Sequence, residues 1–257
     1  MKDSRVTNYD TVAGGYDRRY TLHRYDGVRD TILNFVGPAE LAAILEVGCG
    51  TGHWLQVISD RAHLIAGLDA SARMLERARV AAPRAHLVRG RSEQAPWRDA
   101  SFDRIVCVNA LHHFSDREQF FIEARRLLRP GGGLLTVGLD PHTTRDQWWV
   151  YDYFPETIGI DQARFTPVRV IRGELAKAGF AWAESSEAER IETQLRLGDA
   201  FPDGVERSFT SQLTVLTDEE FARGSERLRL ASEAAAKTGD DVWLTTDLRF
   251  YATIGWV

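Results

Sequence analysis

The chain has 257 residues, of which 44% are hydrophobic and 27% charged, and its formal net charge is −5. This composition is ordinary for a globular protein and suffices for one large α/β domain with a small lid. No block or stripe of Lys and Arg is present, which argues against a nucleic-acid partner. The two cysteines, Cys49 and Cys107, fall within predicted core elements. This fits a reducing compartment and excludes a disulfide scaffold or a multi-cysteine zinc site, so we expect no metal.

The first residues carry no apolar leader, and no apolar run approaches membrane-spanning length. We therefore expect an unprocessed cytoplasmic protein without a membrane partner. Residues 1–40 are polar and aromatic with weak helical character, and we expect them to form N-terminal lid helices that precede a core over residues 41–257.

Short apolar runs alternate with amphipathic stretches between residues 43 and 139. The apolar runs predict buried strands, and the amphipathic stretches predict helices. The expected strands cover residues 43–47, 64–68, 86–88, 102–108 and 134–139, and the expected helices cover residues 51–60, 72–82 and about 117–128. Alternation of this kind predicts a doubly wound parallel sheet with helices on both faces.

The pattern loosens after Asp140. Residues 141–166 are rich in aromatic side chains, and residues 190–240 contain a stretch without a clean period, so we expect cap insertions at both places. The remaining predicted elements are a helix over 168–178, a strand over 180–185, a helix over 219–237 and a terminal strand over 244–257.

A glycine-rich turn separates the first predicted strand from the first helix. Gly48, Gly50 and Gly52 allow the backbone there to turn tightly and to approach a ligand closely. Asp69 ends the next predicted strand, where a carboxylate accepts hydrogen bonds from ribose hydroxyls. The turn alone also fits a ligand-free connection, and Asp69 alone fits a helix-entry residue. Their combination indicates an adenosyl-like ligand.

A nicotinamide dehydrogenase is the competing interpretation, because it also uses a glycine loop and a distal acid. Its fingerprint, G-x-G-x-x-G, requires glycine where this chain has His53. A side chain there compromises the close helix packing and the approach of a pyrophosphate. A ligand without a pyrophosphate is not affected by this difference.

Four segments resemble the motifs of class I S-adenosylmethionine-dependent methyltransferases. They are Glu46–Gly52, Gly67–Leu75, Asn109–Phe114 and Leu128–Gly132. The set is most similar to the ubiquinone/menaquinone-biosynthesis type of small-molecule methyltransferase, and the tyrosine and aspartate pattern of residues 9–17 fits that type. The resemblance covers about residues 9–140 and implies a Rossmann-like, seven-stranded, doubly wound sheet whose last strand is antiparallel.

The resemblance implies S-adenosyl-L-methionine as the cofactor. Asp69 would hold the ribose, Met74 would pack near the adenine, and Tyr16 would close over the cofactor from the lid. Asn109 would contact the methionyl portion through its backbone. The other residues expected at the cofactor are Glu46, Gly48, Cys49, Gly50, Gly52, Ala70, Arg91 and Ser92.

Arg91 departs from the family pattern, which usually has an acidic residue at this position that binds the adenine amino group. A guanidinium cannot accept that hydrogen bond. We expect adenine recognition to fall to backbone amides around Arg91 and Ser92, or to Glu93.

Three histidines are candidates for a general base, which is needed only if the nucleophile must lose a proton. His112 and His113 follow the fourth predicted strand, and His142 follows the fifth, at the sheet edge where such folds bind ligands. Packing beside the cofactor is the alternative role for the pair, and an exposed loop position is the alternative for His142.

Trp148, Trp149 and Tyr151 are the predicted acceptor-binding residues, as part of an aromatic lid; a small hydrophobic subcore is the alternative. The expected function is methyl transfer to a small molecule, in specialised metabolism, by a monomer or homodimer. Two alternatives stay open: an enzyme of the same fold that binds the cofactor but performs other chemistry, and a non-catalytic binding subunit.

Overall fold

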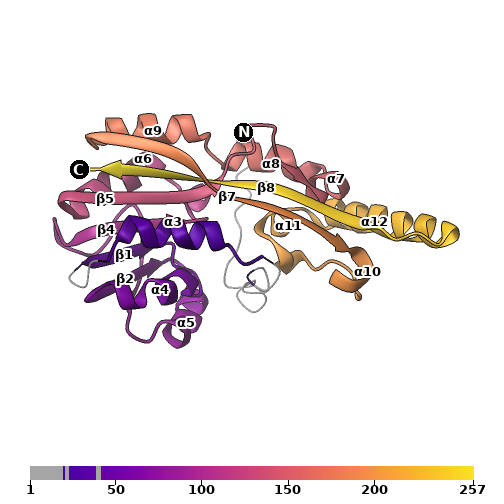
Figure 1. Cartoon of the computed structure of the whole chain (residues 1–257), viewed down its shortest axis with the longest axis horizontal. Helices are drawn as coiled ribbons and strands as arrows, with labels where there is room; N and C mark the ends of the chain where they lie inside the picture. The colour runs from indigo at the N-terminus through magenta and orange to yellow at the C-terminus, as the bar shows by residue number, and fades with distance from the viewer. Residues whose placement is uncertain (1–19, 21–22, 39–41) are drawn as a thin grey trace.

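The computed structural model describes residue 20, residues 23–38 and residues 42–257 (Figure 1). The predicted N-terminal lid, including Tyr16, lies mostly outside these residues. Within them the first full helix is α3, Asp26–Val36.

A twisted mixed sheet forms the centre of the molecule (Figure 1). Its strands are β1 Ala43–Val47, β2 Leu64–Asp69, β3 His86–Arg89, β4 Phe102–Val108, β5 Leu128–Leu139, β6 Gln147–Trp148, β7 Trp182–Arg196 and β8 Trp243–Trp256. Strands β3, β2, β1, β4 and β5 are parallel in this spatial order, and β8 adds antiparallel to β5, with β7 along its other side. The doubly wound fold is confirmed; the two-residue β6 adds to the seven strands expected.

Helices cover both faces of the sheet. They are α4 His53–Val57, α5 Ala72–Ala81, α6 Arg117–Leu127 and α9 Val168–Lys177, with one-turn 3-10 helices at Ser59–Arg61 and Leu111–His113. Side chains of α3, α4 and α5 join the core on one face, and those of α6 and α9 join the core on the other. Strand β1 is buried over its whole length because both of its faces are covered.

The order of the strands reverses between β1 and β4. From β1 the chain first adds β2 and β3 on one side, and then adds β4 and β5 on the other. In open α/β sheets ligands bind outside the carboxyl ends of the strands at such a switch point. The fold therefore places its expected binding crevice beyond Val47 and Val108.

Strand β7 is much longer than predicted. The sequence indicated a strand over 180–185, but β7 continues to Arg196 and pairs with β8 throughout, with an irregularity between Glu187 and Glu189. Side chains along most of β7 are at least partly exposed, so its sequence contains no apolar run from which a buried strand could be predicted. Backbone pairing with β8, rather than burial, defines its outer half.

The outer half of the β7–β8 ribbon projects past the core sheet and carries a cluster of helices, of which only α12 is long (Figure 1). We call these helices the cap. They are α7 Trp149–Tyr153, α8 Glu156–Arg164, α10 Leu197–Ala200, α11 Ser211–Thr214 and α12 Asp218–Thr238, with a 3-10 helix at Arg207–Phe209. A capping box of Thr217 and Glu220 begins α12.

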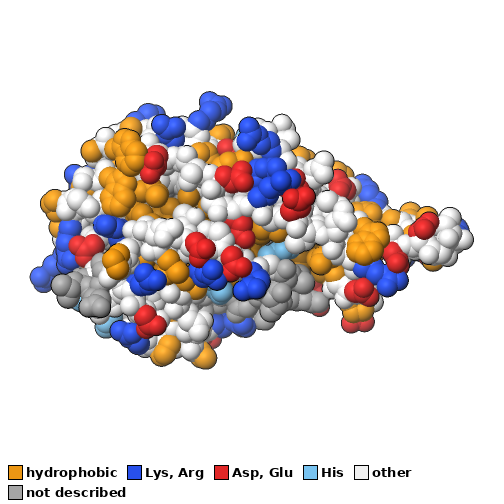
Figure 2. All heavy atoms as spheres, in the orientation of Figure 1, with side chains coloured by type: hydrophobic (Ala, Val, Ile, Leu, Met, Phe, Trp, Pro, Cys, Tyr) orange, Lys and Arg blue, Asp and Glu red, His pale blue; other side chains and the backbone are white. Residues whose placement is uncertain are grey.

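The surface carries charges of both signs. On the face shown in Figure 2, basic and acidic side chains are intermingled rather than gathered into one large patch. No helix in the described part of the chain combines the length and the apolar character needed to cross a bilayer.

Candidate cofactor and acceptor site

A large cavity of about 1070 Å³ lies beyond the carboxyl ends of β1, β2 and β4. We call it the cofactor cavity. The predicted site residues on its wall are Gly48, Gly50, Asp69, Ala70, Met74, Arg91, Ser92, Asn109, His112 and His113. Ligand cavities typically measure about 300–1,000 Å³, so the space can hold a nucleoside-sized ligand and part of a second molecule. Helix α8 and the start of α12 form the opposite wall.

Backbone geometry explains the glycines of the loop. Gly48, Gly50 and Gly52 have φ angles of 74°, 51° and 84°, in the left-handed region that favours glycine. A Cβ atom on Gly48 would lie 2.3 Å from the Cβ of Ala110, and one on Gly52 would lie 2.9 Å from the Cα of Ala78. The loop therefore packs as bare backbone, with Gly48 and Gly50 on the cavity wall.

The carboxylate of Asp69 holds this loop in place. Its Oδ2 accepts a hydrogen bond from the Gly50 amide at 2.8 Å, and its Oδ1 accepts one from the Ser71 amide at 2.8 Å. The same carboxylate lies on the wall of the cofactor cavity, where it can contact a ligand. Ser71 caps α5 by accepting from the Met74 amide, and Met74 thereby packs into the cavity wall.

Glu93 links the wall of the cofactor cavity to the residues that precede α6. Its Oε1 accepts hydrogen bonds from the Ser115 hydroxyl and from the Ser115 and Asp116 amides. Burial alone would raise the pKa of Glu93, but these hydrogen bonds and the nearby charge of Arg91 lower it to about 2. The exposed guanidinium of Arg91 bonds the Ser115 hydroxyl.

Glu46 and Cys49 lie beneath the loop rather than on the cavity wall. Both side chains are buried within the core. Burial, followed by the negative charge of Asp69, raises the pKa of Glu46 well above its usual range. The structure thus places these two predicted cofactor residues behind the backbone that faces the cavity.

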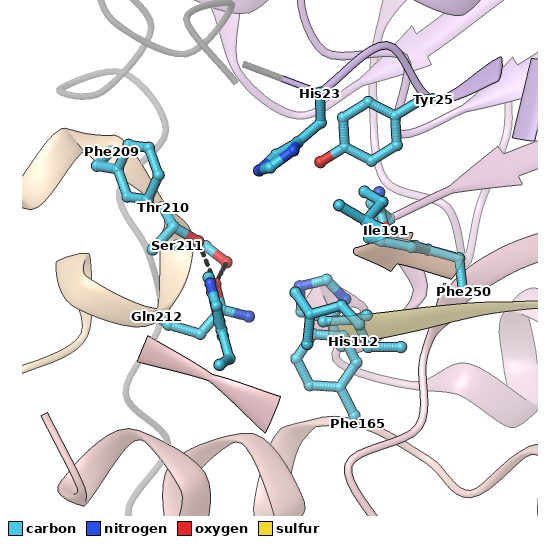
Figure 3. Close-up of a pocket in the computed structure, with 14 residues that line it drawn as sticks. His23, Tyr25, His112, Phe165, Ile191, Phe209, Thr210, Ser211, Gln212 and Phe250 are labelled. Atoms are coloured by element: carbon cyan, nitrogen blue, oxygen red, sulfur yellow. Dashed lines mark hydrogen bonds between the residues drawn. The ribbon is translucent and has the colours of Figure 1, made fainter. Parts of the chain in front are cut away.

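A narrower cavity of about 80 Å³ lies between the core and the cap (Figure 3). We call it the cap cavity. It has room for several waters or for one end of a small ligand. Its aromatic and aliphatic walls are supplied by Tyr25, Leu139, Trp148, Phe165, Ile191, Phe209, Leu248 and Phe250. Asn109 and His112 line both this cavity and the cofactor cavity.

These two shared residues are held firmly. Asn109 has a φ of 51°, a conformation that is uncommon outside glycine and often found at functional sites, and its amide donates to the Val137 carbonyl at 2.8 Å. The ring of His112 stacks on Phe165 with centroids 3.9 Å apart and an interplanar angle of 21°. Of the two cavities, His113 lines only the cofactor cavity.

The other predicted acceptor and base residues lie apart from both cavities, except Trp148. The Nε2 atom of His142 lies 3.0 Å from the Phe165 carbonyl oxygen. Trp149 is buried against Phe201 and Phe209. Tyr151 donates its hydroxyl hydrogen to Asp161 in the interior of the cap. These contacts fit the subcore interpretation for Trp149 and Tyr151.

Several residues of the cap cavity were missed by the sequence analysis. They are His23, Tyr25, Phe165, Ile191, Thr210, Ser211, Gln212 and Phe250. They come from five separate parts of the chain, and the segment around Gln212 has no helical or strand period. Only the aromatic richness around Phe165 gave a local signal.

Comparison with known proteins agrees with this geometry. Residues 45–136 match the family model of the methyltransferase domain. The chain is 33% identical over 155 residues to a demethylmenaquinone methyltransferase of Thermotoga maritima, covering 58% of this chain and 68% of that protein. It is 32% identical over 136 residues to a malonyl-[acyl-carrier protein] O-methyltransferase of Serratia marcescens, covering 52% of each. The chain spans about half the length of several of the curated relatives that it matches.

Comparison with solved structures also finds methyltransferases. A solved putative methyltransferase from an antibiotic biosynthesis pathway of Anabaena variabilis superposes with a TM-score of 0.68 at 22% identity, over 88% of this chain and 96% of that one. Fold, cavity and sequence matches agree, and S-adenosyl-L-methionine is the expected cofactor. The chain belongs to the class I S-adenosylmethionine-dependent methyltransferases, of the quinone-biosynthesis type.

Proposed function

We propose that the protein transfers the methyl group of S-adenosyl-L-methionine to a small molecule held in the cap cavity. One observation carries this proposal: Asn109 and His112 line both cavities. A ligand in either cavity therefore lies against the same two residues. In-line displacement needs the nucleophile and the methyl carbon in direct contact, and adjoining cavities favour that contact.

The residues of the cofactor cavity fit this cofactor. Asp69 lies on the cavity wall and secures the Gly50 and Ser71 amides, and its carboxylate is the kind of group that accepts hydrogen bonds from ribose hydroxyls. The bare backbone at Gly48 permits close approach, and the buried thioether of Met74 supplies an apolar surface for the adenine ring. The cofactor itself supplies an activated methyl group on a cationic sulfur.

His112 is our candidate for the general base when the nucleophile is an oxygen or a nitrogen. Its ring lies at the junction of the cavities, and stacking on Phe165 fixes the ring plane. An imidazole there takes the proton from the acceptor as the new bond to carbon forms.

The identity of the acceptor is not carried over from the relatives. The matched methyltransferase domain ends at residue 136, whereas most of the cap cavity is built from later residues. We therefore assign this chain its own small-molecule acceptor, in specialised metabolism.

Exchange of His112→Phe tests the proposal, because phenylalanine keeps the stacked ring and removes both nitrogens. Transfer of radiolabelled methyl groups to a panel of hydroxyl and amine acceptors should fall about 100- to 10,000-fold. Calorimetry should show unchanged affinity for S-adenosylhomocysteine. Undiminished transfer would refute the role of His112. Cofactor binding without any labelled product would favour different chemistry on the same fold.

A further inference from the structure

A second histidine, His23, borders the cap cavity in addition to His112. It lies in the segment before α3 and lines the cavity together with Tyr25. Tyr25 has a φ of 51°, a left-handed conformation that is unusual for a bulky residue and is often found at functional sites. Figure 3 shows His23 and Tyr25 along one side of the cavity, and His112 with Phe165 along another. An acceptor in this cavity would therefore lie against two imidazoles.

One of the two ring nitrogens of His23 is closed off from the cavity. The ring packs perpendicular to that of Tyr25, with centroids 6.3 Å apart. Its Nδ1 atom is buried and has no hydrogen-bond partner among the described residues. Nε2 is therefore the ring nitrogen of His23 that can contact a ligand in the cap cavity.

Burial also determines the protonation state of His23. Removal from water disfavours the charged imidazolium and lowers the pKa of His23 below its usual value. The other titratable side chains among the described residues of the cavity wall are Tyr25 and His112, and no carboxylate lies there to stabilise an imidazolium. His23 is thus neutral at pH 7, and a neutral imidazole has one N–H donor and one acceptor nitrogen.

The buried nitrogen determines which of the two positions carries the hydrogen. A hydrogen on Nδ1 of His23 would leave an N–H group in the interior without a partner. Such orphan donors are rarer in proteins than acceptors with an unused lone pair. A hydrogen on Nε2 avoids the orphan donor and points an N–H group into the cavity. A general base would need the opposite arrangement, with the lone pair on Nε2, so His23 is suited to donate a hydrogen bond and not to take a proton.

We propose that His23 is a specificity-determining residue, which donates a hydrogen bond from Nε2 to a carbonyl oxygen of the acceptor molecule. A carbonyl fits such a donor because it accepts hydrogen bonds and brings no hydrogen that would need a further partner. The cap cavity would then recognise a molecule that carries a carbonyl group besides its nucleophilic group. This inference deepens the proposed function and rests on it, because it takes the cap cavity to be the acceptor site.

The position of the hydrogen on His23 can be measured directly. The full chain is labelled with ¹⁵N-histidine, and long-range ¹H–¹⁵N correlations from the ring carbons distinguish the two neutral tautomers and the imidazolium. The variant His23→Phe identifies which signals belong to this residue. The neutral Nε2–H form should predominate at pH 7. The Nδ1–H form or the imidazolium as the main species would overturn the inference.

Acetophenone and α-methylstyrene test the hydrogen bond itself, because they have nearly the same shape and only acetophenone has a carbonyl oxygen. Binding of each to the full chain is measured by ligand-observed NMR with S-adenosylhomocysteine present. His23→Phe keeps a ring and removes the donor, so it should weaken acetophenone binding about three- to tenfold, the size of one neutral hydrogen bond. The affinity for α-methylstyrene should not fall. Equal losses for both probes, no loss for acetophenone, or no binding of either probe to the unaltered protein would contradict the proposal.

His23→Gln separates hydrogen-bond donation from proton transfer. The glutamine amide carries an NH₂ group that donates, but it is not a base at neutral pH. This variant should restore most of the acetophenone affinity that His23→Phe loses, and a failure to restore it would count against the donor role.

His63→Phe is the matched control, because His63 is exposed and borders neither cavity. It should leave the affinities for both probes unchanged. A loss as large as that in His23→Phe would show that the effect does not arise at the cavity wall, and would overturn the inference.

These measurements use binding and spectroscopy, whereas the proposed function is tested by transfer of label and by the affinity for S-adenosylhomocysteine. Absence of transfer together with the expected tautomer and probe results would refute the proposed function and leave a carbonyl-binding cavity. Transfer of label without those results would refute only the role of His23.

Discussion

The two cavities that meet at His112 differ in how they offer polar groups. The cofactor cavity is lined by bare backbone and by charged side chains such as Asp69, Arg91 and Glu93. The cap cavity is lined by rings, aliphatic side chains, hydroxyls and amides, with no formal charge among its described residues. The charged cofactor cavity would suit a cationic, polar cofactor, and the cap cavity would suit an uncharged acceptor. The contrast in charge would therefore let one cavity bind the methyl donor and the other select the acceptor.

Acid stability should show the largest contrast between the two regions. Asp161 in the cap has a pKa raised to about 6 by burial, although Arg164, Tyr151 and Gln212 oppose the rise. A raised carboxyl pKa means that the folded state binds the proton more tightly, so this group lowers the free energy of unfolding as pH rises from about 4 to about 6. Denaturation curves should show that Asp161→Asn removes up to about 3 kcal/mol of this decline.

Glu93, on the wall of the cofactor cavity, should change the free energy of unfolding with pH in the opposite direction. Its pKa is lowered to about 2, so its contribution to stability is present above pH 4.5 and is lost as pH falls toward 2. Glu93→Gln should therefore lower the free energy of unfolding at neutral pH but leave it unchanged at pH 2. The exposed Asp203→Asn serves as the control. Parallel pH profiles for Asp161→Asn and Glu93→Gln would contradict the contrast.

Removal of the Asp69 carboxylate should separate the two cavities functionally. Asp69→Ala should weaken S-adenosylhomocysteine binding about 100-fold, because hydrogen bonds to a charged group contribute about 1.5–3 kcal/mol each. Calorimetry is the measurement, and Asp60→Ala is the control, since the Asp60 side chain is 92% exposed. Unchanged cofactor affinity would refute the assignment of the cofactor cavity.

A single glycine should show how tightly the cap is packed. A Cβ on Gly224 of α12 would lie 2.0 Å from the Phe154 ring. Gly224→Ala should therefore lower the free energy of unfolding by about 2 kcal/mol, although alanine favours helix. Gly173→Ala in α9 meets nothing within 4 Å and should raise it by about 0.5–1 kcal/mol. Thermal melts that shift in the same direction would contradict this account.

The smallest expected effect distinguishes strain from crowding in the core. Gly48 and Gly131 have nearly equal φ angles of 74° and 76°, but only Gly48 would bring a Cβ against a neighbour. Both alanine variants should lose about 1 kcal/mol to backbone strain. Gly48→Ala should lose about 1 kcal/mol more, measured by urea denaturation. Equal losses in the two variants would show that Ala110 can shift away from the new Cβ atom without a loss of stability.

The core was predictable because its signals are local. Strands β1 and β4 are continuous apolar runs bounded by turns, and both were predicted with their observed bounds. Ser71 marked the start of α5, and the three glycines marked the loop. Each of these features is required by the conformation of the residues themselves, so the sequence carries it without reference to distant partners.

The cap was only partly predictable, because distant segments determine its structure. Trp148 and Trp149 are adjacent, yet one lines the cap cavity and the other packs in the interior. His112 and His142 both follow strands, but the contact with the Phe165 carbonyl draws the His142 ring away from both cavities. Such outcomes depend on which segments pack together, and no local pattern records that.

The β7–β8 ribbon has a consequence for how this protein can be rebuilt. Its inner half forms the edge of the core sheet, its outer half carries the cap, and the irregularity between Glu187 and Glu189 separates them. A chimera joined at this bulge, with the facing junction at Tyr251 and Phe250, would exchange the outer ribbon while the core strands keep their register. Under the proposed function, recombination at this position would change the acceptor site and leave the cofactor cavity unchanged.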